Sequence, residues 1–493
     1  MSKPDRHTDN KLKLGLALAA IFWIVLWAVV AHVQGNPLLL ADPAETLQAL
    51  WQAVVTQDFW QAVGQTSARI LATAAVSALL GVGLGLVAAG CNPVRILLSP
   101  ILQVMKSVPV GCVVVIVLVM SGAAGALIVI VAFVALPPFY VAALDGWQNR
   151  SRESERVLRC AGVSRFRVFL SCTWPSMLPF LLTATKTAVG LAWKAGITAE
   201  LLCVPLGSIG AAVYVSKLTL DMPSLFMWTI VVMALGWASE KLLLCLLCLT
   251  RKSPRWAVAL SCWREPSQSS LPLSQSSPPV LQHSLDLSHS SPSSETLAAE
   301  EVSFAYGDRL VLSELTLSIA PGERVCLMAP TGSGKTTLIS LLVGANKAQK
   351  GSVVAPRRLG VVTQKDTLVE TLTPLENVQL VCGGYVAKSQ LERELAALLP
   401  EGTIGRAVEE LSGGTRRLVQ IARAIYSATQ ALVMDEPFAG LDDQTNARAC
   451  EFICAHQENR PLLVATHHSL DARRLDARVV TLDGAGGLSA ARM

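Results

Sequence analysis

The nine residues at 329–337 read Ala-Pro-Thr-Gly-Ser-Gly-Lys-Thr-Thr, and they constrain the fold of this chain more than any other stretch. The pattern is typical of a glycine-rich loop at the start of a helix, whose successive backbone N–H groups surround the phosphates of a nucleotide. In such a loop the Lys335 ammonium binds the β- and γ-phosphates and the Thr336 hydroxyl binds Mg²⁺. The other predicted phosphate-binding residues are Thr331, Gly332, Ser333, Gly334 and Thr337.

Two further motifs follow later in the chain. Leu-Ser-Gly-Gly-Thr occupies residues 411–415, and Ala-Leu-Val-Met-Asp-Glu occupies residues 431–436. The apolar residues 431–434 predict a buried strand that delivers Asp435 to the metal, with Glu436 beside it. A glycine-rich loop alone is moderate evidence, whereas the ordered set is far more specific. The sequence therefore predicts that the chain hydrolyses ATP.

Together these motifs resemble the nucleotide-binding domain of ATP-binding cassette transporters over nearly all of residues 297–493. The resemblance implies three catalytic residues: Glu436 acts on the attacking water, His467 contacts the γ-phosphate, and Gln364 touches the metal and the membrane domain. It also implies that Tyr306 stacks on adenine. The implied Mg²⁺ ligands are Thr336, Gln364 and Asp435. The signature residues, which close on the ATP held by an opposite subunit, are Ser412, Gly413 and Gly414.

Two residues depart from the pattern of that family. Ala329 stands where the loop usually starts with glycine, so the backbone there has to avoid positive φ. Thr415 replaces the commonest signature residue, glutamine, but leaves both phosphate-facing glycines intact. We therefore expect an active ATP site. Taken singly, a cluster of glycine and serine is equally typical of a turn, and Tyr306 of an ordinary strand end.

The composition separates a membrane part from a soluble part. Hydrophobic residues make up 52% of the 493 residues and charged residues only 16%, and the mean hydropathy is +0.47. That is too apolar for an all-soluble protein, and the apolar surplus lies before residue 250. The net charge of +5 is small and its basic residues lie beside apolar runs, which argues against nucleic-acid binding. The twelve cysteines are scattered and form neither a disulfide framework nor a zinc motif.

Six apolar stretches before residue 250 are long enough to cross a hydrocarbon core of about 30 Å. They are Leu14–Val33, Ala68–Ala89, Ile96–Met120, Ala123–Ala143, Leu178–Leu202 and Leu225–Leu249. Lys106 and Pro109 interrupt the third, so we expect a broken helix whose freed backbone groups face protein rather than lipid. In the second stretch Gly81, Gly83 and Gly85 are expected to let helices approach closely.

The distribution of basic residues orients these spans. Four Lys or Arg residues precede the first span, none occurs in residues 34–67, and six arginines lie between Arg150 and Arg167. Arg251 and Lys252 follow the last span. We therefore expect a multi-pass protein of the bacterial cytoplasmic (inner) membrane, in contact with lipid, with its N-terminus and ATPase domain in the cytoplasm.

The arginine-rich connection at about 150–172 resembles the cytoplasmic coupling helix of binding-protein-dependent importers, which docks into a groove on the ATPase. Ala-Gly-Val-Ser at 161–164 carries the likeness. That family usually has glutamate six residues before the glycine, where this chain has Arg156, with Glu155 one residue earlier. We therefore expect a shifted charge contact. The alternative is a basic loop held by lipid headgroups.

The residues at 188–202, Ala-Val-Gly-Leu-Ala-Trp-Lys-Ala-Gly-Ile-Thr-Ala-Glu-Leu-Leu, are similar to permeases of the nitrate, sulfonate and taurine importer family. The similarity spans most of residues 60–250. The stretch 265–295 holds twelve serines and five prolines, so it cannot bury enough apolar surface to fold. The predicted chain is multi-domain, with an all-α, six-span, type I importer-like transmembrane permease domain at 1–250, a flexible linker at 251–296 and an α/β P-loop ATPase cassette domain at 297–493.

The resemblance implies a homodimer, joined through both domains, that imports a small anionic solute by alternating access. An extracytoplasmic solute-binding protein would deliver the solute and do most of the selecting, so the sequence leaves the solute itself open. Two alternatives share the nucleotide motifs: an ATP-driven half-exporter and a cassette regulator that does not transport. Short inner loops argue against the exporter, and the intact pair of Asp435 and Glu436 argues against the regulator.

Lys194 lies deep in the fifth predicted span, and Lys186 lies about two helical turns earlier on a similar face. A cation in hydrocarbon costs roughly 2.5–3.5 kcal/mol, so it needs a partner or a cavity. Two cations on one face favour the passage of a small anion. The alternatives are snorkelling or a salt bridge from Lys194 to Glu200 or Glu240.

Overall fold

The chain divides into two compact units in a computed structural model. The model describes residues 6–35, 39–262, 296–307, 309–330, 332–382, 384, 386–482 and 488–490. The first unit comprises Met1–Asn149 and Met177–Thr250, and the second comprises Arg150–Ser176 and Arg251–Met493.

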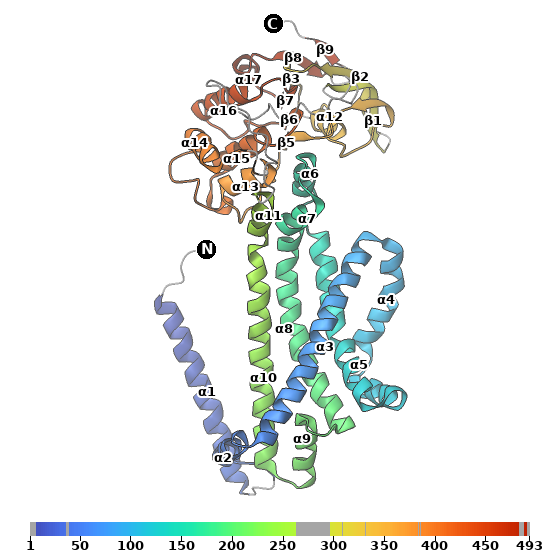
Figure 1. The fold of residues 1–493 in the computed structure, drawn as a ribbon, viewed down its shortest axis with the longest axis vertical. Helices are drawn as coiled ribbons and strands as arrows, with labels where there is room; N and C mark the ends of the chain where they lie inside the picture. The colour runs from blue at the N-terminus through green and yellow to red at the C-terminus, as the bar shows by residue number, and fades with distance from the viewer. Residues whose placement is uncertain are drawn as a thin grey trace, which may run out of the picture. The chain divides into compact units, whose positions relative to one another are not determined.

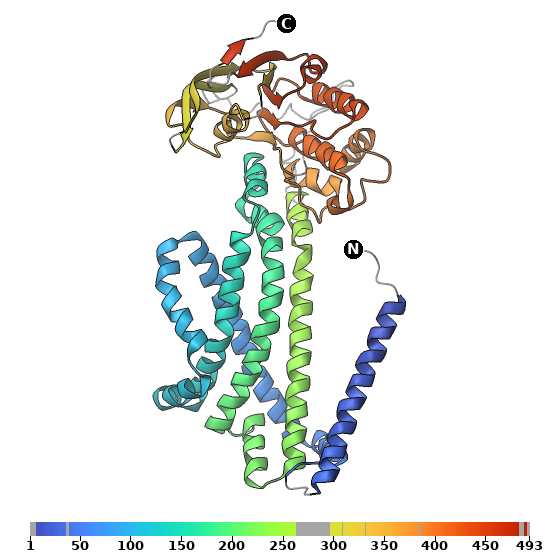
Figure 2. The ribbon, with the colours of Figure 1, turned by 180° about the vertical axis from the view of Figure 1, so that it is seen from behind.

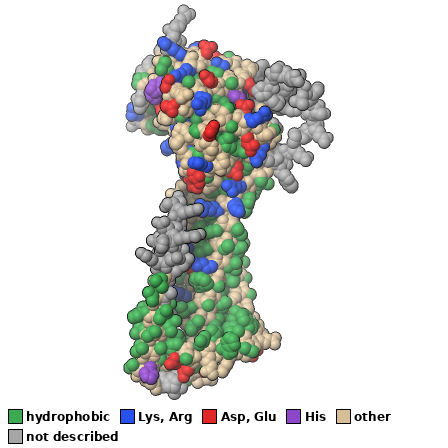
Figure 3. All heavy atoms as spheres, turned by 90° about the vertical axis from the view of Figure 1, so that its left-hand side faces the viewer, with side chains coloured by type: hydrophobic (Ala, Val, Ile, Leu, Met, Phe, Trp, Pro, Cys, Tyr) green, Lys and Arg blue, Asp and Glu red, His purple; other side chains and the backbone are tan. Residues whose placement is uncertain are grey.

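The first unit is entirely helical over its described residues. Its helices are α1 (Arg6–Gln34), α2 (Pro43–Val54), α3 (Gln57–Gly90), α4 (Asn92–Ser107), α5 (Val110–Gln148), α8 (Trp174–Cys203), α9 (Ile209–Leu218) and α10 (Met222–Leu249) (Figure 1). Polar side chains cap the free N–H groups of several first turns: Asp42 forms a capping box with Glu45 on α2, and Ser208 caps α9. Hydrophobic side chains cover most of this unit's surface in Figure 3, whereas charged side chains are spread over the cassette.

Four helices among the described residues are long and apolar enough to cross a membrane. They run over Gln57–Gly90, Val110–Gln148, Arg165–Cys203 and Met222–Ser261. The described apolar part of α1, Leu18–Gln34, is shorter. The third predicted span, Ile96–Met120, is interrupted as the sequence indicates, because α4 ends at Ser107 and α5 begins after Pro109. A second kink lies at Gly122, where φ is +70°. The count of six spans therefore stays a prediction.

Two of the three glycines singled out in the second span do permit a close approach of helices. α3 packs along α5 (Figures 1 and 2). A Cβ atom on Gly81 would lie 2.8 Å from a backbone oxygen of α5, and a Cβ atom on Gly85 would lie 2.7 Å from the Ala143 Cβ atom. Gly83 has no neighbouring atom within 4 Å of that position, so the expectation was wrong for Gly83.

A buried glutamate joins three helices of the first unit. Glu200 on α8 accepts hydrogen bonds from Thr66 Oγ1 at 3.0 Å, Arg69 Nη1 at 3.0 Å and the Gly210 N–H at 3.0 Å. Its side chain is 1% exposed. Arg69 on α3 is thus the cationic partner of Glu200, and the alternative of a salt bridge from Lys194 to Glu200 is wrong. Lys194 is exposed on α8.

The second unit holds two sheets. The strands are β1 (Leu297–Tyr306), β2 (Arg309–Ile319), β3 (Arg324–Met328), β4 (Lys350–Val354), β5 (Leu359–Val362), β6 (Ala431–Asp435), β7 (Leu462–Thr466), β8 (Arg478–Leu482) and β9 (Leu488–Ala490). An antiparallel sheet has the order β2-β1-β4, and a larger sheet has the order β5-β6-β7-β3-β8-β9. The larger sheet is parallel except for β9. Every residue of β6 and β7 is buried, as expected for central parallel strands covered on both faces.

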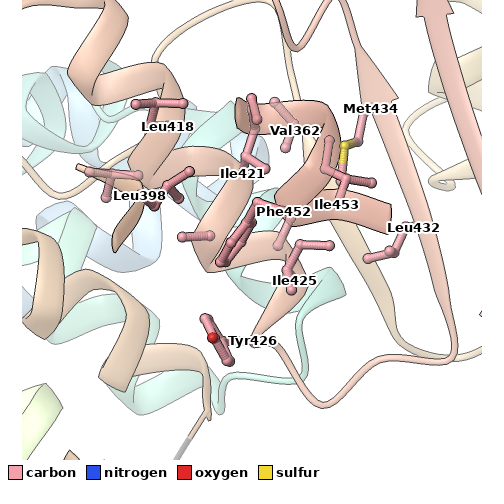
Figure 4. Close-up of a cluster of buried hydrophobic side chains, with 14 of the residues drawn as sticks. Val362, Leu398, Leu418, Ile421, Ile425, Tyr426, Leu432, Met434, Phe452 and Ile453 are labelled. Atoms are coloured by element: carbon pink, nitrogen blue, oxygen red, sulfur yellow. The ribbon is translucent and has the colours of Figure 1, made fainter. Parts of the chain in front are cut away.

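Helices surround these sheets. They are α6 (Arg152–Cys160), α7 (Arg165–Val168), α11 (Ser253–Cys262), α12 (Lys335–Leu342), α13 (Pro374–Cys382), α14 (Lys388–Leu398), α15 (Gly413–Ile425), α16 (Asp443–His456) and α17 (Ser469–Arg474). Figure 4 shows the main apolar core of the cassette, in which Ile421 of α15 and Phe452 of α16 pack with Met434 of β6. Two segments thus belong to the cassette unit, although the sequence predicted them for other parts of the chain. Residues 150–176 were predicted for the permease domain and α11 for the linker.

The boundary of the predicted linker changes accordingly. Residues 253–262 form helix α11, so the linker predicted for 251–296 is helical in its first part. Residues 263–295, which include the serine- and proline-rich stretch, lie outside the described residues. The prediction of a flexible connection applies to them alone.

The glycine contacts between α3 and α5 generate a first prediction. Gly81→Val and Gly85→Val should each destabilise the protein by about 1–3 kcal/mol, because the added side chain overpacks the contact. The expected readout is a lower midpoint of thermal unfolding in detergent, followed by intrinsic tryptophan fluorescence. Gly83→Val is the matched control, since it lies on the same helix with open space around it. Equal stability of all three variants would show that α3 and α5 do not depend on this close approach.

Candidate functional site

The parallel sheet brings the predicted site residues to one edge. The loop at 329–337 follows β3, Asp435 ends β6 with Glu436 directly after it, and His467 follows β7. Gln364 comes two residues after β5. Because these strands are parallel, their carboxyl ends meet at the same edge, which is where such sheets bind ligands.

The described residues of the loop at 329–337 have a backbone that is compatible with phosphate binding. Gly332 has φ of +86° and Gly334 has φ of +102°, which only glycine adopts without strain. Lys335 begins α12, and its Nζ atom donates hydrogen bonds to the carbonyl oxygens of Ala329 and Pro330. Ala329 is outside the positive-φ region, so alanine in place of glycine is tolerated there. Thr331 lies outside the described residues.

Asp435 is a buried carboxylate next to this loop, with 4% of its surface exposed. Burial raises the pKa of Asp435, while a hydrogen bond from Thr336 and the charges of Lys335 and Arg417 lower it. Among the described residues no three His, Cys, Asp or Glu side chains could hold a metal by themselves. Mg²⁺ commonly binds through one or two protein oxygens together with phosphate oxygens, and the pair of Thr336 and Asp435 fits that mode.

The three predicted catalytic residues lie together. The Glu436 carboxylate has one oxygen 3.5 Å from Gln364 Nε2 and the other 3.8 Å from His467 Nδ1. Glu436 has φ of +46°, a strained conformation for a residue with a side chain, and its N–H donates to the Ala465 carbonyl at 2.9 Å. The backbone is thus held so that the carboxylate points into the space between Gln364 and His467.

The signature residues begin α15. Ser412 caps this helix by accepting a hydrogen bond from the Thr415 N–H at 3.3 Å, and the two hydroxyl oxygens lie 2.9 Å apart. Thr415, the departure from the family pattern, therefore supports the cap that precedes Gly413 and Gly414. The predicted adenine-stacking residue, Tyr306, is exposed at the end of β1. An adenine ring could reach Tyr306, whose hydroxyl accepts a hydrogen bond from the side-chain amide of Asn346 at 3.2 Å.

Sequence reasoning missed Arg417, which faces the site from α15. Its Nη1 donates to the Thr363 carbonyl at 2.6 Å and its Nη2 donates to the Gln364 carbonyl at 2.7 Å. Burial lowers the pKa of Arg417, and the charges of Asp366, Asp435 and Glu436 raise it. Arg417 therefore fixes the backbone that carries Gln364 and places a positive charge near both site carboxylates.

Three more side chains of α15 hold the same segment. Gln420 donates to Asp366 at 2.9 Å, Arg416 lies 3.4 Å from Asp366, and the buried Arg423 donates twice to Thr367 at 2.7 Å. The spacing of positions 416, 420 and 423 places them on one helical face. The sequence therefore indicates that these polar side chains share one face of a helix. It does not indicate that this face packs against the segment after β5.

The predicted coupling segment packs on the cassette. Val157 of α6 is buried with Leu359 and Val361 of β5. Glu155 is buried and accepts a hydrogen bond from Thr173 within its own segment, at 2.6 Å, whereas Glu153 lies 4.0 Å from Lys365 of the cassette. The charge contact has thus shifted to Glu153, and the alternative of a loop held only by lipid headgroups does not describe this apolar face.

Comparison with known families agrees with both halves of the chain. The family described as "Binding-protein-dependent transport system inner membrane component" matches residues 81–241, and the family described as "ABC transporter" matches residues 312–439.

The curated relatives match through the cassette. The Nod factor export ATP-binding protein I of Rhizobium etli is 31% identical over 39% of this chain. The matched region spans 66% of that protein, slightly less than two thirds of its length. The aliphatic sulfonates import ATP-binding protein SsuB 1 of Nocardia farcinica is 35% identical over 36% of this chain and 74% of that protein. The protein of the same name in Pseudomonas aeruginosa is 34% identical over 38% of this chain and 82% of that protein. A solved structure of a dimeric bacterial ABC transporter cassette covers 40% of this chain and 99% of its own, at 24% identity and a TM-score of 0.35.

The contacts of Arg417 generate a second prediction. Arg417→Met should lower the kcat of ATP hydrolysis about tenfold, equivalent to about 1.4 kcal/mol, because the backbone carbonyls of Thr363 and Gln364 each lose a donor. It should also move the acid limb of the pH–rate profile to higher pH, since losing a nearby cation raises the pKa of Asp435. Arg417→Lys keeps the charge but cannot bond both carbonyls, so it should lower kcat without moving the acid limb. An unchanged profile in Arg417→Met would remove the electrostatic role.

Proposed function

This chain belongs to the ATP-binding cassette transporters, with a binding-protein-dependent permease domain ahead of an ATPase cassette, and on that premise we propose that it imports a small anionic solute. The solute would be of the nitrate, sulfonate or taurine type. The single observation that carries the proposal is the permease match over 81–241 in the same chain as the cassette. The names of the sulfonate-import relatives agree with it.

One observation supports the export alternative: another relative is named for Nod factor export. The cassettes of both kinds share the nucleotide motifs, so the cassette cannot decide the direction of transport. The permease domain supports import, since it matches a component of binding-protein-dependent systems. An extracytoplasmic solute-binding protein is therefore the proposed partner, and uptake that needs no such protein would count against import.

Two chains are needed for the proposed ATP site. The phosphate loop of one subunit and Ser412, Gly413 and Gly414 of the other would enclose each ATP, which favours a homodimer. Lys335 would bind the β- and γ-phosphates through the Nζ atom that now contacts two loop carbonyls. Mg²⁺, held by Thr336, Asp435 and Gln364, would neutralise phosphate charge. Glu436 would orient the attacking water or take up its proton, and His467 would contact the γ-phosphate.

The segment from 363 to 372 is the proposed route from the ATP site to the permease. Gln364 at its start contacts Glu436, and Val369 and Leu372 at its end lie in a buried cluster with Leu158 of the coupling segment. Side chains of α15 hold the segment between these points. A change at Gln364 on ATP binding would therefore move the coupling segment, which supports alternating access as the mechanism.

The apolar helices and the charge pattern support the proposed membrane location. The described helices include four that can cross a bilayer, and the arginine-rich segment 150–167 packs with the cassette. Arginine-rich segments favour the cytoplasmic side. We therefore keep the bacterial inner membrane, with the cassette in the cytoplasm, as the proposed location.

The anionic character of the solute is supported by α8. Lys186 and Lys194 are exposed along this helix, as are Thr183, Thr187 and Thr198. No described side chain forms an ion pair with Lys194, and Glu200 is already bonded to Arg69. The three threonine hydroxyls donate to carbonyls of their own helix, but the two ammonium groups are costly against lipid, so we place this face along the solute pathway.

Glu436→Gln tests the catalytic part of the proposal. The variant should still bind ATP but lower kcat by at least about a hundredfold, the usual contribution of a positioned general base. Steady-state ATPase in nanodiscs and affinity for a fluorescent ATP analogue would be measured together. Glu401→Gln, an exposed glutamate of a turn, is the matched control. Near-normal turnover of Glu436→Gln would remove Glu436 from the catalytic role.

Lys194→Gln tests the anionic pathway. Binding-protein-dependent uptake of ethanesulfonate or taurine into proteoliposomes should fall at least about tenfold, equivalent to about 1.4 kcal/mol, while basal ATPase stays normal. Lys241→Gln is the control, because Lys241 is also an exposed lysine of a membrane helix. If uptake is unchanged, Lys194 does not serve the solute. If folded protein is lost, Lys194 has a structural partner instead.

A further inference from the structure

Helix α11 continues the last apolar helix of the permease into the cassette unit. α10 ends at Leu249, a short turn covers Thr250–Lys252, and α11 runs over Ser253–Cys262. The helical stretch is continuous from Met222 to Ser261. The cassette therefore holds a second segment of permease sequence besides the coupling segment, which is separated from α11 by the whole of α8, α9 and α10.

Apolar residues of α11 are buried in a cluster built from three parts of the chain. Ala257 is 0% exposed, and it packs together with Val258. The coupling segment contributes Leu158, Ala161, Val163, Val168 and Cys172 to the same cluster. The cassette contributes Val369 and Leu372, and Leu380 and Val381 of α13. Since all three parts share one core, none of them can shift without the others.

Polar contacts fix the orientation of α11 in this core. Ser253 Oγ donates to the Leu170 carbonyl of the coupling segment at 2.9 Å, and Ser261 Oγ donates to the Gln379 carbonyl of α13 at 3.1 Å. Both serines are buried. Ser253, Ala257 and Ser261 are four residues apart, so they lie on one helical face. Arg255 lies 3.4 Å from Glu376, also on α13.

The opposite face of α11 makes no comparable contact with the described residues. Trp256 and Leu260 are 46% and 45% exposed. A helix that merely led into a linker would not need a buried face with two serine hydroxyls bonded to backbone carbonyls of two different segments. The one-sided burial matches a docking surface whose partner is α13 together with the coupling segment.

We propose that α11 is a second coupling element, through which the last permease helix itself holds the cassette. The cassette would then remain attached to the permease without the linker, and its movement would reach α10 directly as well as through α6. The retention needs no transport activity. The transmitted movement rests on the proposed function, since it requires that ATP changes the cassette.

Retention is tested on the full chain with a protease site inserted in the 270–290 stretch. After cleavage in detergent, the two halves of the otherwise unchanged protein should co-elute on gel filtration. Ala257→Glu, which buries a charge in the shared core, should separate them, and Leu260→Glu on the exposed face should not. Arg255→Glu, opposite Glu376 and outside the core, should weaken retention if Ala257→Glu fails to fold. Separation of the unchanged protein, or retention in both Ala257→Glu and Arg255→Glu, would overturn the proposal.

Transmission is tested by hydrogen exchange in the uncleaved chain, with Glu436→Gln present to hold ATP. Adding ATP should change backbone exchange both in the phosphate loop and in α10. With Arg255→Glu or Ala257→Glu added, the phosphate-loop change should remain and the α10 change should disappear. An α10 response that survives both substitutions contradicts a coupling role for α11. Loss of the phosphate-loop response even without them would instead count against the proposed ATP site.

Discussion

The parallel pairing of β3, β7 and β6 is the constraint on which the cassette depends. In this register Met328 lies opposite Thr466, and Asp435 lies opposite Ala465. The phosphate loop, the two acidic residues and His467 therefore leave the sheet at one level, although about a hundred residues or more separate the first from the others. The complete burial of β6 and β7 makes this register costly to change, because a one-residue shift would exchange the side chains packed in the two cores on either face of the sheet and move Asp435 away from Thr336.

Helix α15 connects the signature residues to the segment that follows β5 at that edge of the sheet. Its first residues are the signature, and its later side chains Arg416, Arg417, Gln420 and Arg423 bond the segment that follows β5. A helix is stiff along its axis, so a displacement at Ser412 would also move Arg417, whose guanidinium donates to the Gln364 carbonyl. Binding of an ATP held by a partner's phosphate loop would thus displace the Gln364 backbone in this subunit. In the proposed homodimer, the signature residues would in this way act on Gln364 although they lie apart from the chain's own phosphate loop in sequence.

Much of this arrangement could be predicted from the sequence, and the parts that could not share one physical cause. The phosphate loop, the Asp435 strand and the broken third span each depend on residues close together in the chain, such as Gly334 beside Lys335 or Pro109 after Lys106. Arg417 was missed because its role depends on hydrogen bonds to two backbone carbonyls that lie more than fifty residues away in the sequence. The fold also corrected two local interpretations, since Glu200 pairs with Arg69 rather than Lys194, and 253–262 are helical. In both cases the competing partner is distant in sequence, and periodicity carries no information about it.

The position of α11 changes what the fusion of permease and cassette in one chain can accomplish. A flexible connection of the kind predicted from the sequence would raise the local concentration of the cassette without transmitting orientation or force. Docked surfaces do transmit them, because a packed core has a small number of discrete arrangements rather than a continuum. α6 and α11 share such a core with Val369 and Leu372, only a few residues after Gln364. Val369 and Leu372 follow Gln364 by only five and eight residues. If α11 is the second coupling element that we propose, a single shift of this segment would therefore act on two permease helices at once.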